Sequence, residues 1–205
     1  MSAESGLSDR SARHAARMAR KKALIDAAIA AASDERGLLL VVTGNGKGKS
    51  TAAFGMVARA LGHGMKVGVV QFIKSRTDTG EEAFLGTQPG VEWHVTGDGF
   101  TWDTQNREQD IATAGRGWEI AARMLADPAY QLVVLDELTY LLSYGYLDSD
   151  SVLDALAQRP AMQHVVVTGR AAPDALIDLA DTVSVVADRK HAFRAGVKAQ
   201  PGIDF

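Results

Sequence analysis

Residues 37–60, GLLLVVTGNGKGKSTAAFGMVARA, decide the fold of this chain. They begin with the aliphatic run 38–42, a pattern typical of a strand covered on both faces in a parallel sheet. Glycines and lysines follow over 44–49, and residues 50–60 then have helical spacing. A buried strand, a glycine-rich loop and a helix in this order predict a phosphate-binding loop at the carboxyl end of the strand.

The loop contains the residue types that bind a triphosphate. Its glycines allow backbone N–H groups to point inward, Lys49 supplies a positive charge, and the hydroxyl of Ser50 or Thr51 can reach Mg²⁺. The general template G-x-x-x-x-G-K-[S/T] fits at its end, but its first glycine falls on Thr43. A glycine-rich turn without a ligand is the alternative, and the flanking strand and helix count against it.

Length and composition narrow the class of protein. A chain of 205 residues fits one domain with its own core. Cysteine is absent, which excludes disulfides and thiol-based sites. A net charge of −3 argues against a protein built mainly to bind nucleic acid. The sequence has neither a signal-peptide pattern nor a long apolar run, so we expect a cytoplasmic protein with no membrane contact.

Strand and helix patterns alternate after residue 60. Strands are predicted at 66–72, 91–95, 132–138, 165–168 and 182–186, and helices at 106–126, 149–158 and 173–179, with one helical turn near 81–85. This alternation predicts an α/β fold of the P-loop NTPase-like kind, with a mostly parallel six-stranded sheet and helices on both faces. The ligand should lie at the carboxyl ends of the strands, near 44–50, 71–74, 136–137 and 168–170.

Residues 1–36 differ in composition from the domain expected over 37–205. Basic residues are interspersed with alanines, and a few apolar residues follow at helical spacing before Gly37. This pattern predicts a basic helical extension. It could be a solvated surface helix, a flap that closes over the active site or a partner subunit, or, as a minor alternative, a nucleic-acid contact.

Two acidic residues, Asp136 and Glu137, follow four apolar residues in the predicted strand 132–138, LVVLDEL. Carboxylates at the end of a buried strand are costly unless they meet a cation. In a P-loop protein that cation is Mg²⁺, held by the acidic end of this strand. Pairing with arginine or backbone amides is the structural alternative.

No nucleophile–base set, acid–base pair or zinc spacing stands out in the sequence. A transferase whose second substrate brings its own nucleophile would need only positioning and leaving-group stabilisation from the protein.

Several motifs together resemble one family over residues 37–205. They are TGNGKGKST, VGVVQFIK, GFTWDTQNRE, VVLDELTYLL, VTGR, LADTVS and KHAFRAGVKAQPGIDF. They resemble the ATP:corrinoid adenosyltransferases, the cob(I)alamin adenosyltransferases of the P-loop type, which share the departure at Thr43. The resemblance implies that a Co(I) corrinoid attacks the 5′ carbon of ATP, giving adenosylcobalamin or an adenosylcobinamide-type product and inorganic triphosphate. It also implies that ATP lies reversed in the loop, that Mg²⁺ or Mn²⁺ is bound, that a reduced flavodoxin-like flavoprotein donates electrons, and that the protein is a homodimer.

The resemblance also implies roles for individual residues. Phosphate contacts fall on Gly44, Asn45, Gly46, Lys47, Gly48, Lys49, Ser50, Thr51 and Arg170, a nucleoside contact on Arg59, and metal binding on Ser50, Glu137 and Asp136. Phe100 and Trp102 match aromatics thought to displace the lower axial ligand of the corrin, which makes Co(II) four-coordinate and easier to reduce. Without the resemblance, these two aromatics would be interpreted as core residues of an edge strand. His191 is expected to be structural.

Two other functions remain compatible with the loop. A P-loop kinase or NTPase would act at phosphorus and release ADP or AMP. A non-catalytic nucleotide-binding or nucleic-acid-binding module is the second, and the acidic balance of the chain counts against it.

Overall fold

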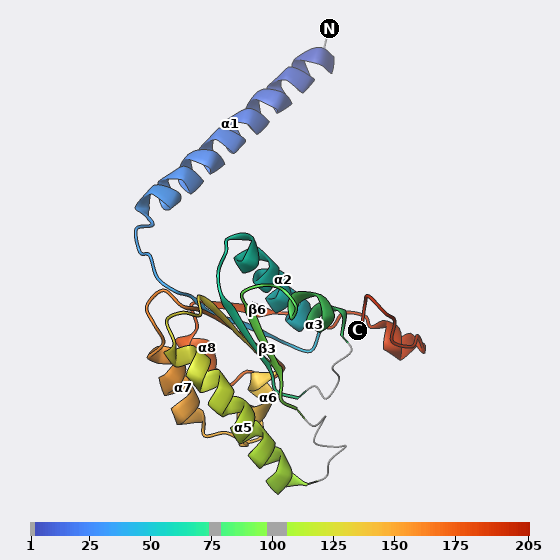
Figure 1. Cartoon of the computed structure of the whole chain (residues 1–205). Helices are drawn as coiled ribbons and strands as arrows, with labels where there is room; N and C mark the ends of the chain where they lie inside the picture. The colour runs from blue at the N-terminus through green and yellow to red at the C-terminus, as the bar shows by residue number, and fades with distance from the viewer. Residues whose placement is uncertain (1–2, 74–78, 98–105) are drawn as a thin grey trace. The chain divides into compact units, whose positions relative to one another are not determined.

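The computed structural model describes residues 3–73, 79–97 and 106–205 (Figure 1). Contacts divide the chain into two compact units, Met1–Glu35 and Arg36–Phe205. The first unit contains the helix α1 (Ala3–Ala31), as the basic pattern predicted. No helix in the described part of the chain has the length and apolar character to cross a membrane.

The second unit is built on a parallel sheet of six strands, which confirms the predicted fold class. The strands are β1 (Leu39–Thr43), β2 (Val67–Gln71), β3 (Val91–Val95), β4 (Leu132–Asp136), β5 (His164–Thr168) and β6 (Thr182–Val185). Their order is β3-β2-β4-β5-β1-β6. The carboxyl ends of β2, β4, β5 and β1 therefore stand in one row.

Helices cover both faces of this sheet (Figure 1). They are α2 (Lys49–Gly62), α3 (Gly80–Leu85), α5 (Arg107–Ala126), α6 (Leu138–Ser143), α7 (Ser149–Ala157) and α8 (Asp174–Leu179), and a 3₁₀ turn, η1, spans Ala192–Ala195. Side-chain caps begin three of these α-helices: Thr79 accepts from the Glu82 N–H, Asn106 from the Gln109 N–H and Asp148 from the Ser151 N–H.

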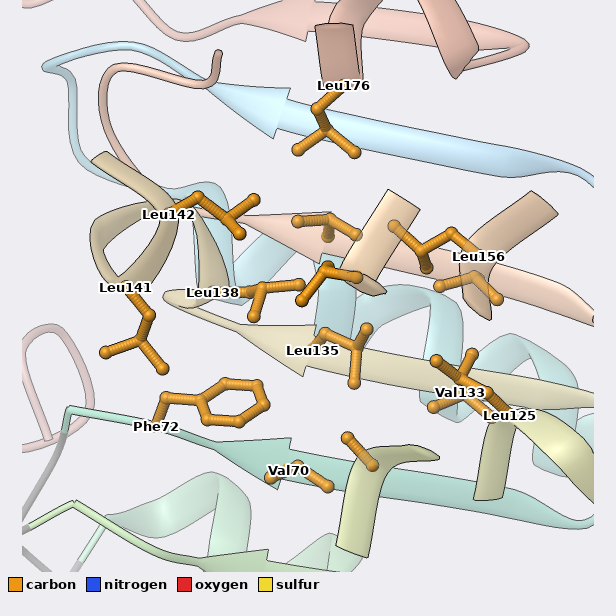
Figure 2. Packing of buried hydrophobic residues seen from close by; sticks show 14 of the residues in the cluster. Val70, Phe72, Leu125, Val133, Leu135, Leu138, Leu141, Leu142, Leu156 and Leu176 are labelled. Atoms are coloured by element: carbon orange, nitrogen blue, oxygen red, sulfur yellow. The ribbon is translucent and has the colours of Figure 1, made fainter. Parts of the chain in front are cut away.

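Alternate strand residues divide between two cores. Val134 and Val166 point to the side of α2 and α3, whereas Val133, Leu135 and Val167 point to α5, α6, α7 and α8. Figure 2 shows the second core, where Leu138, Leu142, Leu156 and Leu176 pack over the central strands. Aliphatic runs without polar alternation are thus explained by burial on both faces.

One predicted strand extends too far. The strand expected over 132–138 ends at Asp136, and Glu137 has φ 64°, a left-handed conformation uncommon outside glycine. A short helix, α6, then begins at Leu138, where none was predicted. The apolar residues of α6 belong to the same core as β4, so the apolar run continued while the backbone changed direction. The N-terminal helix, expected to run up to Gly37, ends at Ala31, and the boundaries of the other predicted elements differ from the structure by at most two residues.

Candidate active site

The loop between β1 and α2 packs against the chain that follows β6. The Gly46 N–H donates to the Val186 carbonyl at 2.8 Å. A Cβ at Gly44 would lie 2.5 Å from the same carbonyl oxygen, and one at Gly46 would lie 2.7 Å from the Ala187 carbonyl oxygen. Gly44 and Gly48 have φ of 102° and 118°. Glycine is therefore required at these positions by close approach or by backbone conformation.

Lys49 lies at the first position of α2 with only 6% of its surface exposed. Its Nζ donates to the Gly46 carbonyl at 2.9 Å, so the ammonium group is held inside the loop by the loop itself. Burial lowers the pKa of Lys49 below its ordinary value; Glu137 acts in the opposite direction and Arg170 in the same direction. Asp136 also raises the pKa of Lys49, so Lys49 lies near one other cationic side chain and two carboxylates.

The last residues of β2, β4 and β5 form a buried hydrogen-bonded row. Thr168 Oγ1 donates to Asp136 Oδ1 at 2.7 Å, and Gln71 Nε2 donates to Asp136 Oδ2 at 2.9 Å. Gln71 Oε1 in turn accepts from the indole N–H of Trp93 at 3.1 Å. The Glu137 N–H donates to Thr168 Oγ1 at 3.0 Å. We call Trp93, Gln71, Asp136 and Thr168 the strand-end row.

The turn after β5 is tied to the start of α6. Thr139 Oγ1 donates to the Arg170 carbonyl at 2.6 Å, and Ser143 Oγ donates to the Ala171 carbonyl at 2.9 Å. Gly169 has φ 136°, and a Cβ there would lie 2.1 Å from Thr139 Oγ1. These contacts hold Arg170 at the carboxyl edge of the sheet. Thr43 joins the same turn, because its hydroxyl accepts from the Ala172 N–H at 3.3 Å.

A polar cavity of about 260 Å³ opens above the loop. It is lined by loop residues 45–51 together with Glu81, Glu137, Arg170, His191, Ile203 and Asp204. The C-terminal tail reaches this cavity, where Lys47 Nζ lies 2.8 Å from Asp204 Oδ1. That contact is the main reason that the pKa of Asp204 lies below its ordinary value.

A second hollow of about 610 Å³ adjoins the polar cavity and shares Thr51, Glu81 and Ile203 with it. Its other walls are mainly apolar, with Phe54, Gly55 and Ala58 on α2, Phe84 and Leu85 on α3, and Phe205 from the tail. A Cβ at Gly55 would meet no atom within 4 Å. Close packing within the protein therefore does not require this glycine, which opens space along the helix.

The structure brings together most of the predicted site residues. Those lining the polar cavity are Asn45, Gly46, Lys47, Gly48, Lys49, Ser50, Thr51, Glu137 and Arg170. Gly44 lies under the loop against Val186, and Asp136 lies beneath the cavity in the strand-end row. Arg59 is not brought to the cavity: it follows Lys49 by ten residues on α2, about 15 Å along the axis. Phe100 and Trp102 lie outside the described residues.

Sequence reasoning missed several residues of this site. Gln71 and Thr168 were predicted to lie at strand ends near the ligand, but neither was given a role. Each is a polar residue at the end of an otherwise aliphatic strand, and this pattern could have marked both as site residues. His191 was expected to be structural, and its Nδ1 accepts from the Phe193 N–H at the start of η1; it also lines the polar cavity, which was not predicted. Glu81 lies in the predicted helical turn near 81–85 and Asp204 in the motif KHAFRAGVKAQPGIDF, but neither was predicted as a site residue.

The oxygen ligands in the cavity fit a magnesium ion. Ser50 and Glu137 line the same wall and provide a hydroxyl and a carboxylate, which are hard ligands suited to Mg²⁺ or Mn²⁺. Among the described residues there is no group of three His, Asp or Glu side chains placed to hold a metal alone. An ion bound here would complete its coordination with phosphate oxygens and water, as Mg²⁺ commonly does.

Comparison with known proteins identifies the family. The model of the "ATP:corrinoid adenosyltransferase BtuR/CobO/CobP" family matches residues 35–205, and the model "Cob(I)alamin adenosyltransferase N terminal" matches residues 1–29. This chain belongs to the ATP:corrinoid adenosyltransferase family.

Individual members of this family are similar over almost their whole length. A corrinoid adenosyltransferase of Pseudomonas aeruginosa is 62% identical over 94% of this chain and 96% of its own length. One from Escherichia coli K12 is 54% identical and one from Salmonella typhimurium 53%, each over 94% of this chain and 98% of its own. The resemblance noted in the sequence motifs is confirmed. The match to the N-terminal model also covers residues 1–29 of the basic helix, whereas the motif resemblance covered only residues 37–205.

Proposed function

We propose that this protein transfers the 5′-deoxyadenosyl group of ATP to the cobalt of a Co(I) corrinoid. The electron pair of Co(I) attacks the 5′ carbon, the C5′–O bond breaks, and its electrons leave on inorganic triphosphate. Family membership over nearly the whole chain carries this proposal, and the polar cavity above the loop supports it. No protein base is required, because the nucleophile belongs to the corrinoid.

The work of the protein is to hold the triphosphate and stabilise its growing charge. The loop residues 45–51, among them Lys49, line the polar cavity together with Arg170, which supports this role. Such donors are already in place before the reaction, so they stabilise the leaving group without reorganisation. A leaving triphosphate, rather than a transferred phosphoryl group, requires the 5′ carbon to face the corrinoid.

Ser50 and Glu137 would hold Mg²⁺ or Mn²⁺ beside the triphosphate. When bound, the ion supplies positive charge that neutralises the departing phosphate oxygens. Asp136 was predicted as a third ligand, and both of its carboxylate oxygens accept hydrogen bonds from protein side chains.

We place the nucleoside of ATP in the apolar hollow that adjoins the polar cavity. Its mainly apolar walls suit a planar base, and the space left at Gly55 lies on the face of α2 that also carries Thr51. The contact predicted for Arg59 is a separate proposal, because Arg59 lies in the last turn of α2 and lines a different cavity, with Met56 and His63.

The remaining proposals concern electron supply and assembly. Phe100 and Trp102 displace the lower axial ligand of the corrin, and a reduced flavoprotein supplies the electron to Co(II). The protein works as a cytoplasmic homodimer. The basic helix covers the corrinoid. Family resemblance supports the aromatic pair, the electron donor and the homodimer, and the basic helical pattern of residues 1–36 supports the covering helix. Sedimentation analysis would test the dimer directly, with a monomer at micromolar concentration as the contrary result.

Product analysis tests the main proposal. With ATP, Mg²⁺ and a chemically reduced corrinoid, we expect the absorbance change of Co–C bond formation and one inorganic triphosphate per bond. A kinase or NTPase would instead release ADP or AMP, and either product in stoichiometric amount would refute the assignment.

The double variant Phe100→Ala with Trp102→Ala tests the aromatic pair separately. It should fail when a mild flavoprotein reductant must make Co(I), and it should work when the corrinoid is supplied already reduced. Equal loss in both assays would mean that the pair positions the corrin or holds the core.

A further inference from the structure

Three members of the strand-end row are almost completely buried, whereas Trp93 is partly buried. Asp136 and Thr168 have no exposed surface, and Gln71 has 1%. A buried carboxylate is costly unless hydrogen bonds compensate for its lost hydration. Both oxygens of Asp136 accept such bonds, from Thr168 and Gln71.

The hydrogen bonds of this row have fixed directions. The Trp93 indole can only donate, so the oxygen of the Gln71 amide faces Trp93 and its nitrogen faces Asp136. An ionised carboxylate can only accept, so the hydroxyl hydrogen of Thr168 points to Asp136. A lone pair of Thr168 Oγ1 is then available for the Glu137 N–H. The charge of Asp136 thus sets the orientation of the group that holds Glu137.

Glu137 needs this support because of its backbone conformation. Its φ of 64° is unusual for a residue with a side chain and must be maintained by its surroundings. The bond to Thr168 holds the peptide N–H at the point where β4 turns into α6. The direction in which the Glu137 carboxylate leaves the chain depends on this turn.

We propose that Thr168, Gln71 and Asp136 are positioning residues that aim Glu137 at the metal beside the triphosphate, and that Asp136 is not itself a metal ligand. The inference rests on the proposed metal site at Ser50 and Glu137. It departs from the prediction that placed Asp136 among the ligands, because both oxygens of Asp136 accept hydrogen bonds from protein donors and Asp136 is not among the described residues that line the cavity.

The binding of Mn²⁺ to the protein–ATP complex, measured by electron paramagnetic resonance without corrinoid, tests this inference apart from turnover. Thr168→Val removes the hydroxyl at constant shape and should raise the Mn²⁺ dissociation constant about 10- to 100-fold. Calorimetric ATP binding without metal should stay at the parent value. Thr168→Ser keeps the hydroxyl and should restore Mn²⁺ binding.

A charge swap within the row separates positioning from ligation. Asp136→Asn alone puts an amide nitrogen against the nitrogen of Gln71 and should weaken Mn²⁺ binding. Adding Gln71→Glu should restore Mn²⁺ binding, because the new carboxylate accepts from Trp93 and from the new amide, whose oxygen still accepts from Thr168. A double variant as defective as Asp136→Asn alone would overturn the inference, since the charge would then be needed at position 136 itself.

Gln163→Leu is the matched control for Gln71→Leu. Gln163 is a second buried glutamine, 2% exposed, whose amide donates to the carbonyls of Met124, Asp127 and Tyr130 at the opposite edge of the sheet. Both variants should lose thermal stability, but only Gln71→Leu should lose Mn²⁺ affinity. Equal losses of affinity would overturn the positioning role, as would parental affinity in Thr168→Val.

Glu137→Gln distinguishes failure of the inference from failure of the proposed site. If Glu137→Gln weakens Mn²⁺ binding and Thr168→Val does not, only the positioning role is wrong. If Glu137→Gln binds Mn²⁺ like the parent, the metal site itself is misassigned and the inference falls with it. Circular dichroism of each variant confirms folding, and the two conservative changes, Thr168→Ser and the charge swap, keep the test open if Thr168→Val does not fold.

Discussion

Replacing Lys49 by methionine should weaken ATP binding while making the protein more stable. The ammonium lies inside the loop, 2.9 Å from the Gly46 carbonyl oxygen, and is nearly buried. A hydrogen bond between an ammonium and a phosphate contributes about 1.5–3 kcal/mol. At about 1.4 kcal/mol per tenfold change, Lys49→Met should raise the dissociation constants of ATP and inorganic triphosphate about 10- to 140-fold.

The gain in stability follows from the pKa of Lys49, which burial lowers below its ordinary value of 10.5. Between the folded and the unfolded pKa the unfolded chain binds more protons, so the free energy of unfolding rises with pH in that window. Below the window the cost of burying the charge is fully present. Lys49→Met removes this cost, so the variant should unfold at higher temperature near neutral pH and should lack the rise toward pH 10.5.

Calorimetry with ATP and triphosphate, and thermal unfolding across pH, measure both effects. Lys47→Met is the matched control in the same loop: its side chain is 44% exposed and screened by solvent. Lys47→Met should change the dissociation constants of ATP and triphosphate about fivefold or less. Parental ATP affinity in Lys49→Met would refute the phosphate cradle, and lower stability at every pH would refute the burial argument.

Three further predictions follow from the hollow, the edge of the sheet and the basic helix. Gly55→Leu fills the apolar hollow and should weaken ATP binding without changing triphosphate binding. Gly115→Leu, at an equally open glycine on α5, is the control and should change the binding of neither ligand. If Gly55→Leu weakened the binding of both ligands, the substitution would have damaged the phosphate loop. Glu92, whose pKa is lowered to about 2 chiefly by the Tyr130 hydroxyl, contributes stability above its unfolded pKa of 4.5 that is lost as pH falls from 4.5 toward 2. A third of the Glu92 side chain is exposed, so solvent screens part of this effect. Glu92→Gln should lower the free energy of unfolding by about 1–2 kcal/mol at neutral pH, measured by denaturant titration, and should reduce its fall between pH 4.5 and pH 2. An unchanged fall in that pH range would contradict the assignment. Deleting residues 1–35 should leave an ATP-binding sheet unit but raise the corrinoid KM, and an unchanged KM would make the basic helix a solvated surface element.

The phosphate loop and the fold class were predictable because their signals are local. Burial on both faces produces the aliphatic run 38–42, and glycines mark the loop because only they adopt its backbone or permit its close contacts. The acidic end of β4 was equally visible, since a carboxylate after an aliphatic strand needs a partner.

The sequence by itself thus determined where the loop lies, which strands are buried and which family the chain resembles. Only the tertiary structure decided which strand ends meet. Strand order places Gln71, Asp136 and Thr168 side by side although up to 97 residues separate them, and periodicity carries no information about such pairing. The left-handed Glu137 and the Lys47–Asp204 contact depend on atoms distant in the chain as well. A sequence pattern predicts whether a residue is buried. The hydrogen-bond partner that compensates a buried polar residue depends on which strands pair in the folded sheet.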